Sequence, residues 1–96
     1  MTNDPGILVL ASLADGEKHG YTIMADIKAF ANVEMGPGTL YGAIARLEQR
    51  GLIHPVASDD RKRPYRLTSA GRKHLNDAIA SLQTIVRVGT KRLRHA

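Results

Sequence analysis

The side chains best suited to chemistry in this sequence are histidines, serines and carboxylates, because it contains no cysteine. Two imidazoles that stand four residues apart on one helix face can share a zinc ion. No pair has that spacing among the four histidines, which are His19, His54, His74 and His95. The serines and carboxylates form no recognisable pair of nucleophile and base. We therefore expect a protein that is not an enzyme and that holds no metal and no cofactor.

The cationic residues carry a stronger signal, because they gather in the second half of the chain. Residues 1–45 hold two basic and five acidic residues, for a net charge of −3. Residues 46–96 hold twelve basic and four acidic residues, for a net charge of +8, and the whole chain carries +5. A basic half fits either a solvated surface or a surface that binds a polyanion such as nucleic acid. The positions of the cations have to decide between the two.

Length and composition limit the remaining possibilities. A chain of 96 residues with 43% hydrophobic and 24% charged residues has the composition of one globular domain. The longest uncharged runs are about half of the ~20 residues that a membrane span requires. The first four residues contain an aspartate and no Lys or Arg, unlike the basic start of a signal peptide. We expect a cytoplasmic protein with no membrane segment.

Three helices are expected in the first half of the chain. Asp4 before Pro5 favours a helix start, since Asp can cap a helix and Pro suits its first position. A second helix is predicted from about Gly20, because apolar residues recur there at helical spacing. A third helix is predicted to begin at Pro37 and to end at Gly51, which is followed by an apolar residue as in a Schellman cap.

A small antiparallel hairpin is expected next. Its strands are predicted at residues 53–57 and 65–68, and Asp59-Asp60 favours a turn between them. Pro55 would confine the first strand to a sheet edge or end it early, because proline cannot donate a ladder hydrogen bond.

A long amphipathic helix, capped by Thr68 or Ser69, is predicted after the hairpin. Three helices, a hairpin and a helix are the elements of a winged helix-turn-helix with a helical extension. The predicted fold class is therefore mainly α with a small β-hairpin. We assign residues 1–71 to a winged helix-turn-helix DNA-binding domain and residues 72–96 to a C-terminal dimerisation helix and basic tail.

The third helix presents small residues to solvent when Leu40, Ile44 and Leu47 face inward. Its outer face then consists of Gly38, Thr39, Gly42, Ala45, Arg46 and Gln49, with Tyr41 on the flank. Small residues let a duplex approach closely, and free N–H groups at the helix start can bind a phosphate. Arg46 can reach either a base edge or a phosphate. Such residues also occur on helices that bind nothing, so the face alone does not establish binding.

A second cationic group lies at the predicted hairpin tip, where Arg61, Lys62 and Arg63 follow one another. Three cations in a loop are often only solvated, but an extended loop can also set them against consecutive phosphates or a narrow minor groove. In a winged helix the third helix and this loop flank the same edge. Together they predict one continuous surface for double-stranded DNA.

Several short motifs follow one another in a fixed order along the chain: His19-Gly20-Tyr21, Gly38-Thr39-Leu40-Tyr41, Ile44, Arg46-Leu47, Gly51-Leu52-Ile53, Arg61-Lys62-Arg63-Pro64-Tyr65-Arg66-Leu67-Thr68 and Gly71. Together, over about residues 5–71, they resemble the PadR family of bacterial transcriptional regulators. The sequence departs from the family at Pro64, where many members have an aromatic residue. The short segment after Gly71 is similar to members with a single C-terminal helix.

The resemblance implies a dimeric protein, usually a repressor, whose third helix enters the major groove while the wing touches the backbone or the minor groove. By position, it implies helix contacts at Thr39, Tyr41 and Arg46. It implies wing contacts at Arg61, Lys62 and Arg63, and Tyr21 is a further candidate for the DNA backbone. With the small residues Gly38 and Gly42, these helix and wing residues form the predicted DNA-binding set. Family members often respond to small molecules, so an effector of unknown identity is a candidate partner.

The last helix carries an apolar seam with alternating spacings of four and three, formed by Leu75, Ile79, Leu82 and Val86. The seam could cover the core of its own domain, but three helices already enclose that core. We therefore expect it to pair with a second copy in a symmetric homodimer. Such a dimer would place two third helices for half-sites ~34–36 Å apart, or a multiple of that, and would favour a pseudo-palindromic operator.

Two function hypotheses follow from the sequence. The first is a sequence-specific DNA-binding transcriptional regulator, a repressor that binds its operator as a homodimer. The alternative is a winged-helix protein–protein interaction module that docks another protein through the same basic edge, since one fold hosts many functions. The dependence of binding on salt separates them, because only contacts to several phosphates weaken steeply as salt rises.

Overall fold

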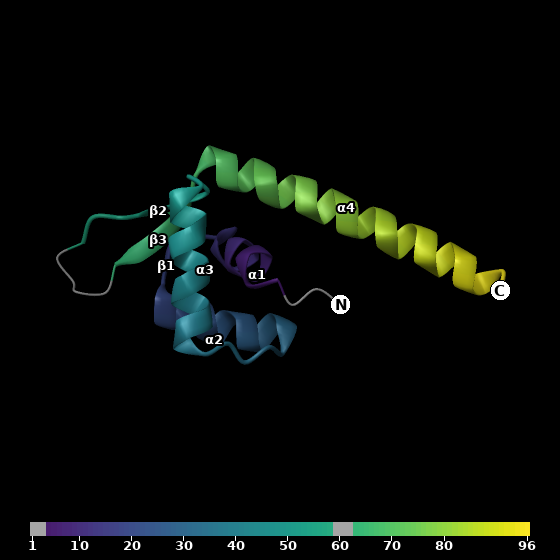
Figure 1. Ribbon diagram of the computed structural model, residues 1–96, viewed down its shortest axis with the longest axis horizontal. Helices are drawn as coiled ribbons and strands as arrows, with labels where there is room; N and C mark the ends of the chain where they lie inside the picture. Colours follow the sequence, from purple (N-terminus) through teal and green to yellow (C-terminus); the bar gives the residue numbers. More distant parts are fainter. Residues whose placement is uncertain (1–3, 59–62) are drawn as a thin grey trace.

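The computed structural model of the protein describes residues 4–58 and 63–96. Four helices and three short strands follow one another in the described part of the chain (Figure 1). They are α1 (Pro5–Leu13), β1 (Lys18–His19), α2 (Gly20–Ala31), α3 (Pro37–Gln49), β2 (Ile53–Pro55), β3 (Pro64–Leu67) and α4 (Ser69–Arg94). The expected fold class, mainly α with a small hairpin in a winged helix-turn-helix arrangement, is confirmed.

The helix boundaries follow from local capping signals. The carboxylate of Asp4 accepts the N–H of Gly6 at 2.9 Å, so α1 is capped where the sequence predicts. At the end of α3, Gly51 has a φ of 72°. The N–H of Leu52 donates to the carbonyl of Leu47 at 2.9 Å, and the N–H of Gly51 donates to the carbonyl of Glu48 at 2.9 Å. These two bonds define the predicted Schellman cap.

The sheet contains one strand more than the sequence indicates. The predicted hairpin forms from β2 and β3, and β2 ends at Pro55 on the edge of the sheet. On the other side of β3 lies β1, whose Lys18 pairs with Tyr65 and whose His19 pairs with Pro64. A strand of two residues is too short for alternation to reveal it. The turn predicted at residues 59–60 lies outside the described residues.

The core lies where α1, α2 and α3 meet the sheet, and apolar side chains fill it. Its largest members, each less than 2% exposed, come from these helices and β2: Val9, Leu10, Leu13, Ile23, Ile27, Leu40 and Ile53. Fully burying a side chain of this size stabilises the fold by about 1.5–3 kcal/mol relative to leaving it exposed. Leu75 of α4 also joins this core, at 6% exposure.

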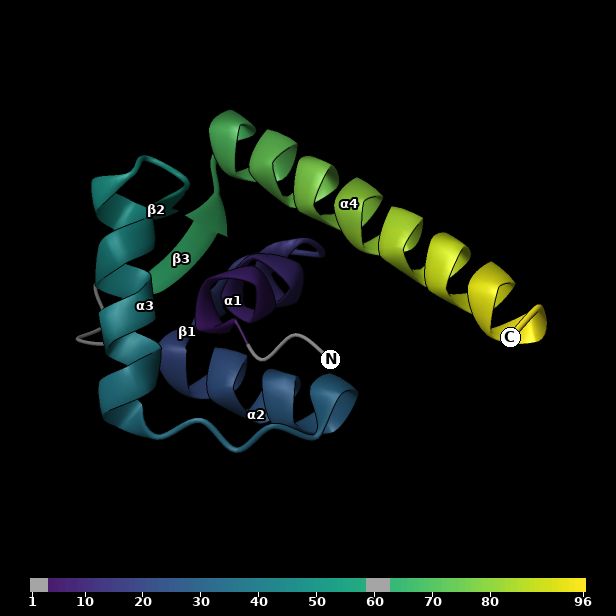
Figure 2. The same ribbon diagram turned by 45° about the vertical axis from the view of Figure 1, so that its right-hand side comes forward.

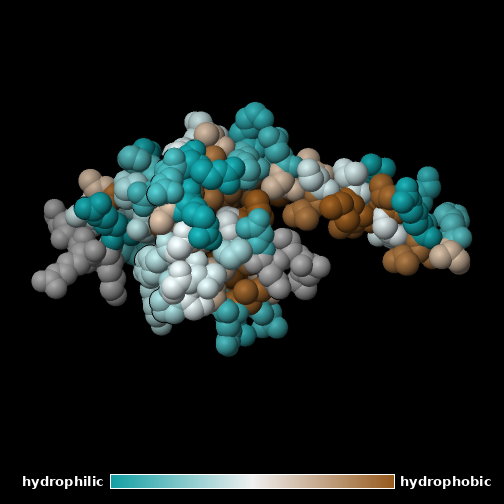
Figure 3. Space-filling model, viewed as in Figure 1, coloured by the Kyte–Doolittle hydropathy of each residue, from teal (hydrophilic) through white to brown (hydrophobic). Residues whose placement is uncertain are grey.

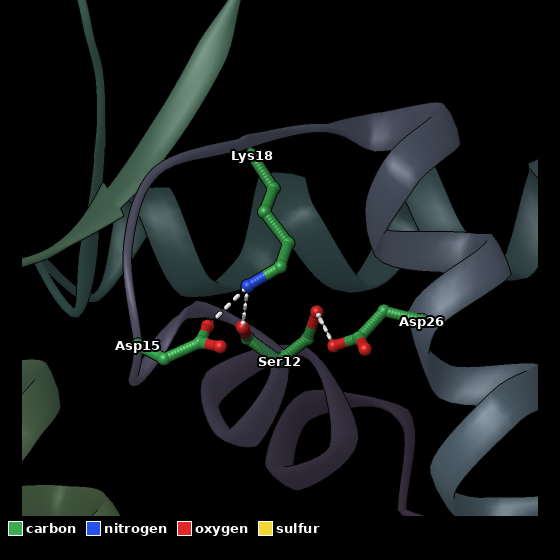
Figure 4. A network of polar contacts seen from close by, with 4 residues as sticks. All are labelled: Ser12, Asp15, Lys18 and Asp26. Atoms are coloured by element: carbon green, nitrogen blue, oxygen red, sulfur yellow. Dashed lines mark hydrogen bonds and ion pairs between the residues drawn. The ribbon is translucent and has the colours of Figure 1, made fainter.

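A polar network beside the core ties α1 to α2 and β1 (Figure 4). Ser12 is 1% exposed, and its hydroxyl donates to the carboxylate of Asp26 on α2 at 2.7 Å. The ammonium of Lys18 donates to the backbone carbonyl of Ser12 and to the carboxylate of Asp15. The hydrogen bond and charge of Lys18 hold the pKa of Asp15 below its usual value. The network thereby ties β1 and the middle of α2 to α1.

A second set of contacts joins the end of α3 to the start of α4, and we call it the α3–α4 corner: Gly51, Leu52, Thr68 and Gly71. The hydroxyl of Thr68 donates to the carbonyl of Gly51 at 2.6 Å and accepts the N–H of Gly71 at 3.0 Å. The N–H of Thr68 donates to the carbonyl of Leu52 at 3.1 Å. A Cβ at Gly71 would collide with that same carbonyl oxygen, so only glycine allows this close approach.

Beyond the corner, α4 runs away from the other elements as a single arm (Figures 1 and 2). Although glycine is a poor helix former, α4 continues through Gly89 to Arg94, so the predicted basic tail is helical almost to its end. None of the helices in the described residues combines the length and hydropathy that a membrane crossing requires.

We predict that Ser12→Ala lowers the free energy of unfolding by about 1–3 kcal/mol, the cost of leaving a half-buried carboxylate without its hydroxyl donor. Urea denaturation followed by circular dichroism measures this loss. The same substitution at Ser81, which is exposed on α4, is the matched control and should change stability by less than about 0.5 kcal/mol. Equal effects of the two substitutions would show that the bond to Asp26 contributes nothing.

Candidate nucleic-acid interface

The outer face of α3 is small and polar, because its apolar residues face the core. Leu40, Ile44 and Leu47 are buried, as the spacing predicts, and Ala43 is buried beside them. On the opposite face, Gly38, Thr39, Ala45, Arg46 and Gln49 are exposed, Tyr41 is half exposed and Gly42 is partly covered. Pale and teal residues accordingly cover this end of the molecule in the space-filling view (Figure 3). A duplex could approach this face without meeting a bulky aliphatic side chain.

The start of α3 offers unpaired backbone donors. Its N-cap is Gly36, and no described side chain caps the helix. The N–H of Leu40 donates to the carbonyl of Gly36 at 3.0 Å, which is the first bond of the helix. The N–H groups of Gly38 and Thr39 precede it and have no carbonyl partner in the helix. Both residues are exposed, so these donors can reach an anion such as a phosphate oxygen.

Arg46 lies one to two turns further along the same face. A Cβ built at Gly42 would be 3.5 Å from a guanidinium nitrogen of Arg46, so the guanidinium lies over Gly42. Arg46 forms no ion pair with the residues that the structure describes. Its charge therefore stays available to a ligand, and the small residue beneath it leaves the side chain free to extend.

The wing is described only at its base. Arg61 and Lys62 lie outside the described residues, and Arg63 is exposed next to β3. The hairpin closes with a hydrogen bond of 2.8 Å from the N–H of Val56 to the carbonyl of Pro64. In both ribbon views α3 and the strands β2 and β3 lie at the end of the molecule opposite the free end of α4 (Figures 1 and 2).

The pKa of Tyr65 on β3 responds to residues of α3 and of the base of the wing. Partial burial raises the pKa of its hydroxyl above the ordinary value of 10.0. The charges of Glu48 and Tyr41, both on α3, raise this pKa further, while Arg63 lowers it. The backbone geometry leads to the same segment, because a Cβ at Gly20 would touch the Tyr41 ring, and His19, the residue before Gly20, pairs with Pro64. Since Arg63 directly precedes Pro64, Tyr41 and Arg63, two members of the predicted DNA-binding set, lie toward the same edge.

Two residues of this contact, Glu48 and Tyr65, were not singled out as site residues from the sequence. Tyr65 belongs to the motif that carries the family resemblance, which was the signal for its importance. Glu48 had no signal in the sequence, because its effect on the pKa of Tyr65 arises only from the folded arrangement. Tyr21 is 69% exposed at the start of α2, where it remains a candidate for backbone contact.

The residues expected at a dimer interface divide into two groups. Leu75 is 6% exposed and belongs to the core of its own chain, because α4 still lies against α1 there. Further along α4, Ile79, Leu82 and Val86 are 41%, 37% and 66% exposed. The neighbouring Ile85, which lies outside the predicted seam, is 66% exposed. These four residues form what we call the α4 stripe. Figure 3 shows brown residues gathered along this arm.

The model of a family described as "Transcriptional regulator PadR-like family" matches residues 9–77. The chain is 51% identical over 81 residues to an uncharacterized 37.1 kDa protein in transposon TN4556 of Streptomyces fradiae. That alignment covers 84% of this chain and 24% of the relative, so the chain spans about a quarter of the relative's length. It is 33% identical over 82 residues to a transcriptional regulator of Mycobacterium tuberculosis, covering 82% of this chain and 76% of that protein.

Solved structures share the fold along nearly the whole chain. A PadR family transcription regulator from Clostridium difficile superposes with a TM-score of 0.84 at 24% identity, covering 93% of this chain and 97% of that one. A transcriptional regulator from Clostridium thermocellum has a TM-score of 0.81 at 26% identity, covering 95% and 96%. The matches confirm the resemblance found in the sequence to a family of transcriptional regulators.

We predict that Glu48→Gln moves the pKa of Tyr65 down towards its ordinary value of 10.0, because a negative charge that opposes tyrosinate is removed. Titration of the tyrosine ring carbons by NMR between about pH 8 and 12 measures the shift. Glu34→Gln, which lies before α3 and pairs with Lys28, is the control and should leave Tyr65 unchanged.

The same raised pKa gives a sign for the dependence of stability on pH. A hydroxyl whose pKa is higher in the folded protein contributes stability that is fully present below about pH 10 and is lost as pH rises through the folded pKa. Stability should therefore fall above about pH 10, and less so in Tyr65→Phe. If the stability of Tyr65→Phe fell just as steeply above about pH 10, the raised pKa of Tyr65 would not be the cause of the loss.

Proposed function

The chain belongs to the PadR-like family of transcriptional regulators, and on this premise we propose that it represses transcription by binding a specific DNA operator. The observation that carries the proposal is the shared edge of α3 and the wing. This edge carries the exposed Arg46, the unpaired N–H groups at the start of α3 and the exposed Arg63 at the base of the wing. Neither Arg46 nor Arg63 forms an ion pair with an acidic residue that the structure describes.

In this proposal α3 enters the major groove. Thr39, Tyr41 and Arg46 face the bases and the adjoining backbone, and an arginine there can pair with two acceptors of a guanine. Gly38 and Gly42 keep the helix surface low enough for close approach. The free N–H groups of Gly38 and Thr39 bind a phosphate at the groove edge, where the helix dipole favours negative charge.

The wing supplies sequence-independent affinity. Arg61, Lys62 and Arg63 contact phosphates or a narrow minor groove beside the site read by α3. Arg63 supports this role by its exposure and by its position near Tyr65, next to α3. Contacts to phosphate orient the protein on the duplex, while contacts from α3 provide the sequence preference.

The second partner in the proposal is another copy of the chain. The α4 stripe exposes four aliphatic side chains on one arm, and a two-fold interface would remove them from water. Two copies joined in this way carry two α3 helices and would read a pseudo-palindromic operator with half-sites ~34–36 Å apart or a multiple of that. Leu75 is not part of the proposed interface, because its own chain already buries it.

We predict that Arg46→Ala and Arg63→Ala weaken operator binding differently. Arg46→Ala should reduce the binding free energy by about 1–3 kcal/mol and make the protein less selective for its preferred sequence. Arg63→Ala should weaken binding to all duplexes alike and reduce the slope of log affinity against log salt concentration by about one. An operator selected from a random DNA pool, followed by fluorescence anisotropy at about 50–200 mM salt, measures both effects.

Arg92→Ala is the matched control, because it removes the same charge from the end of α4 that lies far from α3 (Figure 1). It should leave affinity within about twofold of the unchanged protein. If all three variants bind equally well, the proposed DNA surface is wrong. An affinity that does not change with salt concentration would instead indicate a module that docks another protein.

We predict that Leu82→Asp dissociates the proposed homodimer. The substitution should weaken the free energy of association by more than about 2 kcal/mol, because a charge would be buried in an apolar interface. Sedimentation velocity measures the mass, and circular dichroism checks that the chain is folded. Thr84→Asp is the control, since Thr84 lies about 200° round the helix from Leu82. A folded Leu82→Asp protein that still sediments as a dimer would place the interface elsewhere.

A further inference from the structure

Gly20 is the first residue of α2, and it is buried. Glycine is often required where φ is positive, but among the described glycines only Gly16 and Gly51 have such backbones. The backbone at Gly20 would therefore accept any residue. What glycine provides at this position is space.

Tyr41 of α3 occupies that space. A Cβ built at Gly20 would lie 2.5 Å from the hydroxyl oxygen of Tyr41, 2.8 Å from its Cζ and 2.9 Å from its Cε1. Real Cβ atoms essentially never approach another heavy atom this closely. At Gly36 and Gly38, by contrast, a Cβ would meet open space. The tyrosine ring thus rests directly on the first residue of α2.

The position of this ring matters because three elements meet there. Tyr41 is 50% exposed on the flank of the proposed DNA-reading face. His19, the residue before Gly20, pairs with Pro64 of β3, and Lys18 pairs with Tyr65. Partial burial raises the pKa of Tyr65, and Tyr41 adds to that rise. The ring therefore stands between α2, α3 and the base of the wing.

We propose that Gly20 is a positioning residue for DNA binding, whose missing side chain seats the ring of Tyr41 and so sets where its hydroxyl meets the duplex. This inference rests on the proposed function, because it assigns Gly20 a role through Tyr41 in the same surface. Gly20 itself is buried and makes no contact with DNA.

The structure also predicts which group moves when a Cβ is added at Gly20. The three heavy atoms closest to the added Cβ all belong to the outer end of one tyrosine side chain. Rotation of that side chain relieves the collision, and the backbone of α2 can remain in place. Gly20→Ala should therefore move the ring while leaving the chain folded.

The first measurement follows the ring in the protein without DNA. The chain has three tyrosines and no tryptophan, so each tyrosine ring signal can be assigned by substitution with phenylalanine. In Gly20→Ala the NMR signals of Tyr41 should shift markedly and those of Tyr21 should shift less. Gly89→Ala is the control, because a Cβ there meets open space on α4, and it should leave the signals of Tyr41 unchanged.

The second measurement is a double-mutant cycle for DNA affinity, with Gly20→Ala, Tyr41→Ala and the double variant. The probe is a labelled duplex of mixed sequence, about 40 base pairs long and at about 50 mM salt, so that no operator has to be known. Gly20→Ala should weaken binding about three- to tenfold in the natural background and less than about twofold in the Tyr41→Ala background.

The outcomes separate this proposal from the proposed function. A ring shift together with a non-additive loss of affinity supports it. An unchanged Tyr41 signal overturns it, as does a shifted ring with full affinity while Arg46→Ala still weakens binding. If the unaltered protein binds no duplex, the proposed function fails and the positioning role fails with it, although the ring shift would still report the contact. If Gly20→Ala does not fold, recovery of folding in the double variant supports the contact, and failure to recover overturns it.

Discussion

The α3–α4 corner is the constraint on which the arrangement of both proposed surfaces depends. One hydroxyl, that of Thr68, donates to Gly51 at the end of α3 and accepts from Gly71 in the first turn of α4. The close contact between Gly71 and the carbonyl of Leu52 removes the remaining freedom. The corner therefore holds the helix proposed to read DNA at a defined angle to the helix proposed to bind a second copy.

Much of this fold could be predicted from the sequence, because the decisive signals are local. A capping aspartate before proline, a glycine followed by leucine and a threonine before the last helix each act within one turn of chain. The apolar spacing in α3 likewise identified Leu40, Ile44 and Leu47 as buried. The same spacing predicts which residues of α3 face solvent, and these include its small residues and Arg46.

The features that could not be predicted arise from contacts between distant segments. The strand β1 is two residues long and exists because β3 offers a free edge. Leu75 has the same spacing as the exposed residues of the α4 stripe, and only the place where α4 leaves α1 makes it part of the core. The contact between Gly20 and Tyr41 joins the starts of two helices. No local pattern marks it.

The uninterrupted length of α4 gives the α3–α4 corner a mechanical consequence. A helix of 26 residues extends about 39 Å. It acts as a lever, and turning it by about 5° at its base displaces its free end by about 3 Å. In a two-fold assembly the converse also holds. A small slide of one α4 helix along the other changes the distance between the two α3 helices. Geometry at the far end of the arm can thus be converted into a choice between correctly and incorrectly spaced binding sequences.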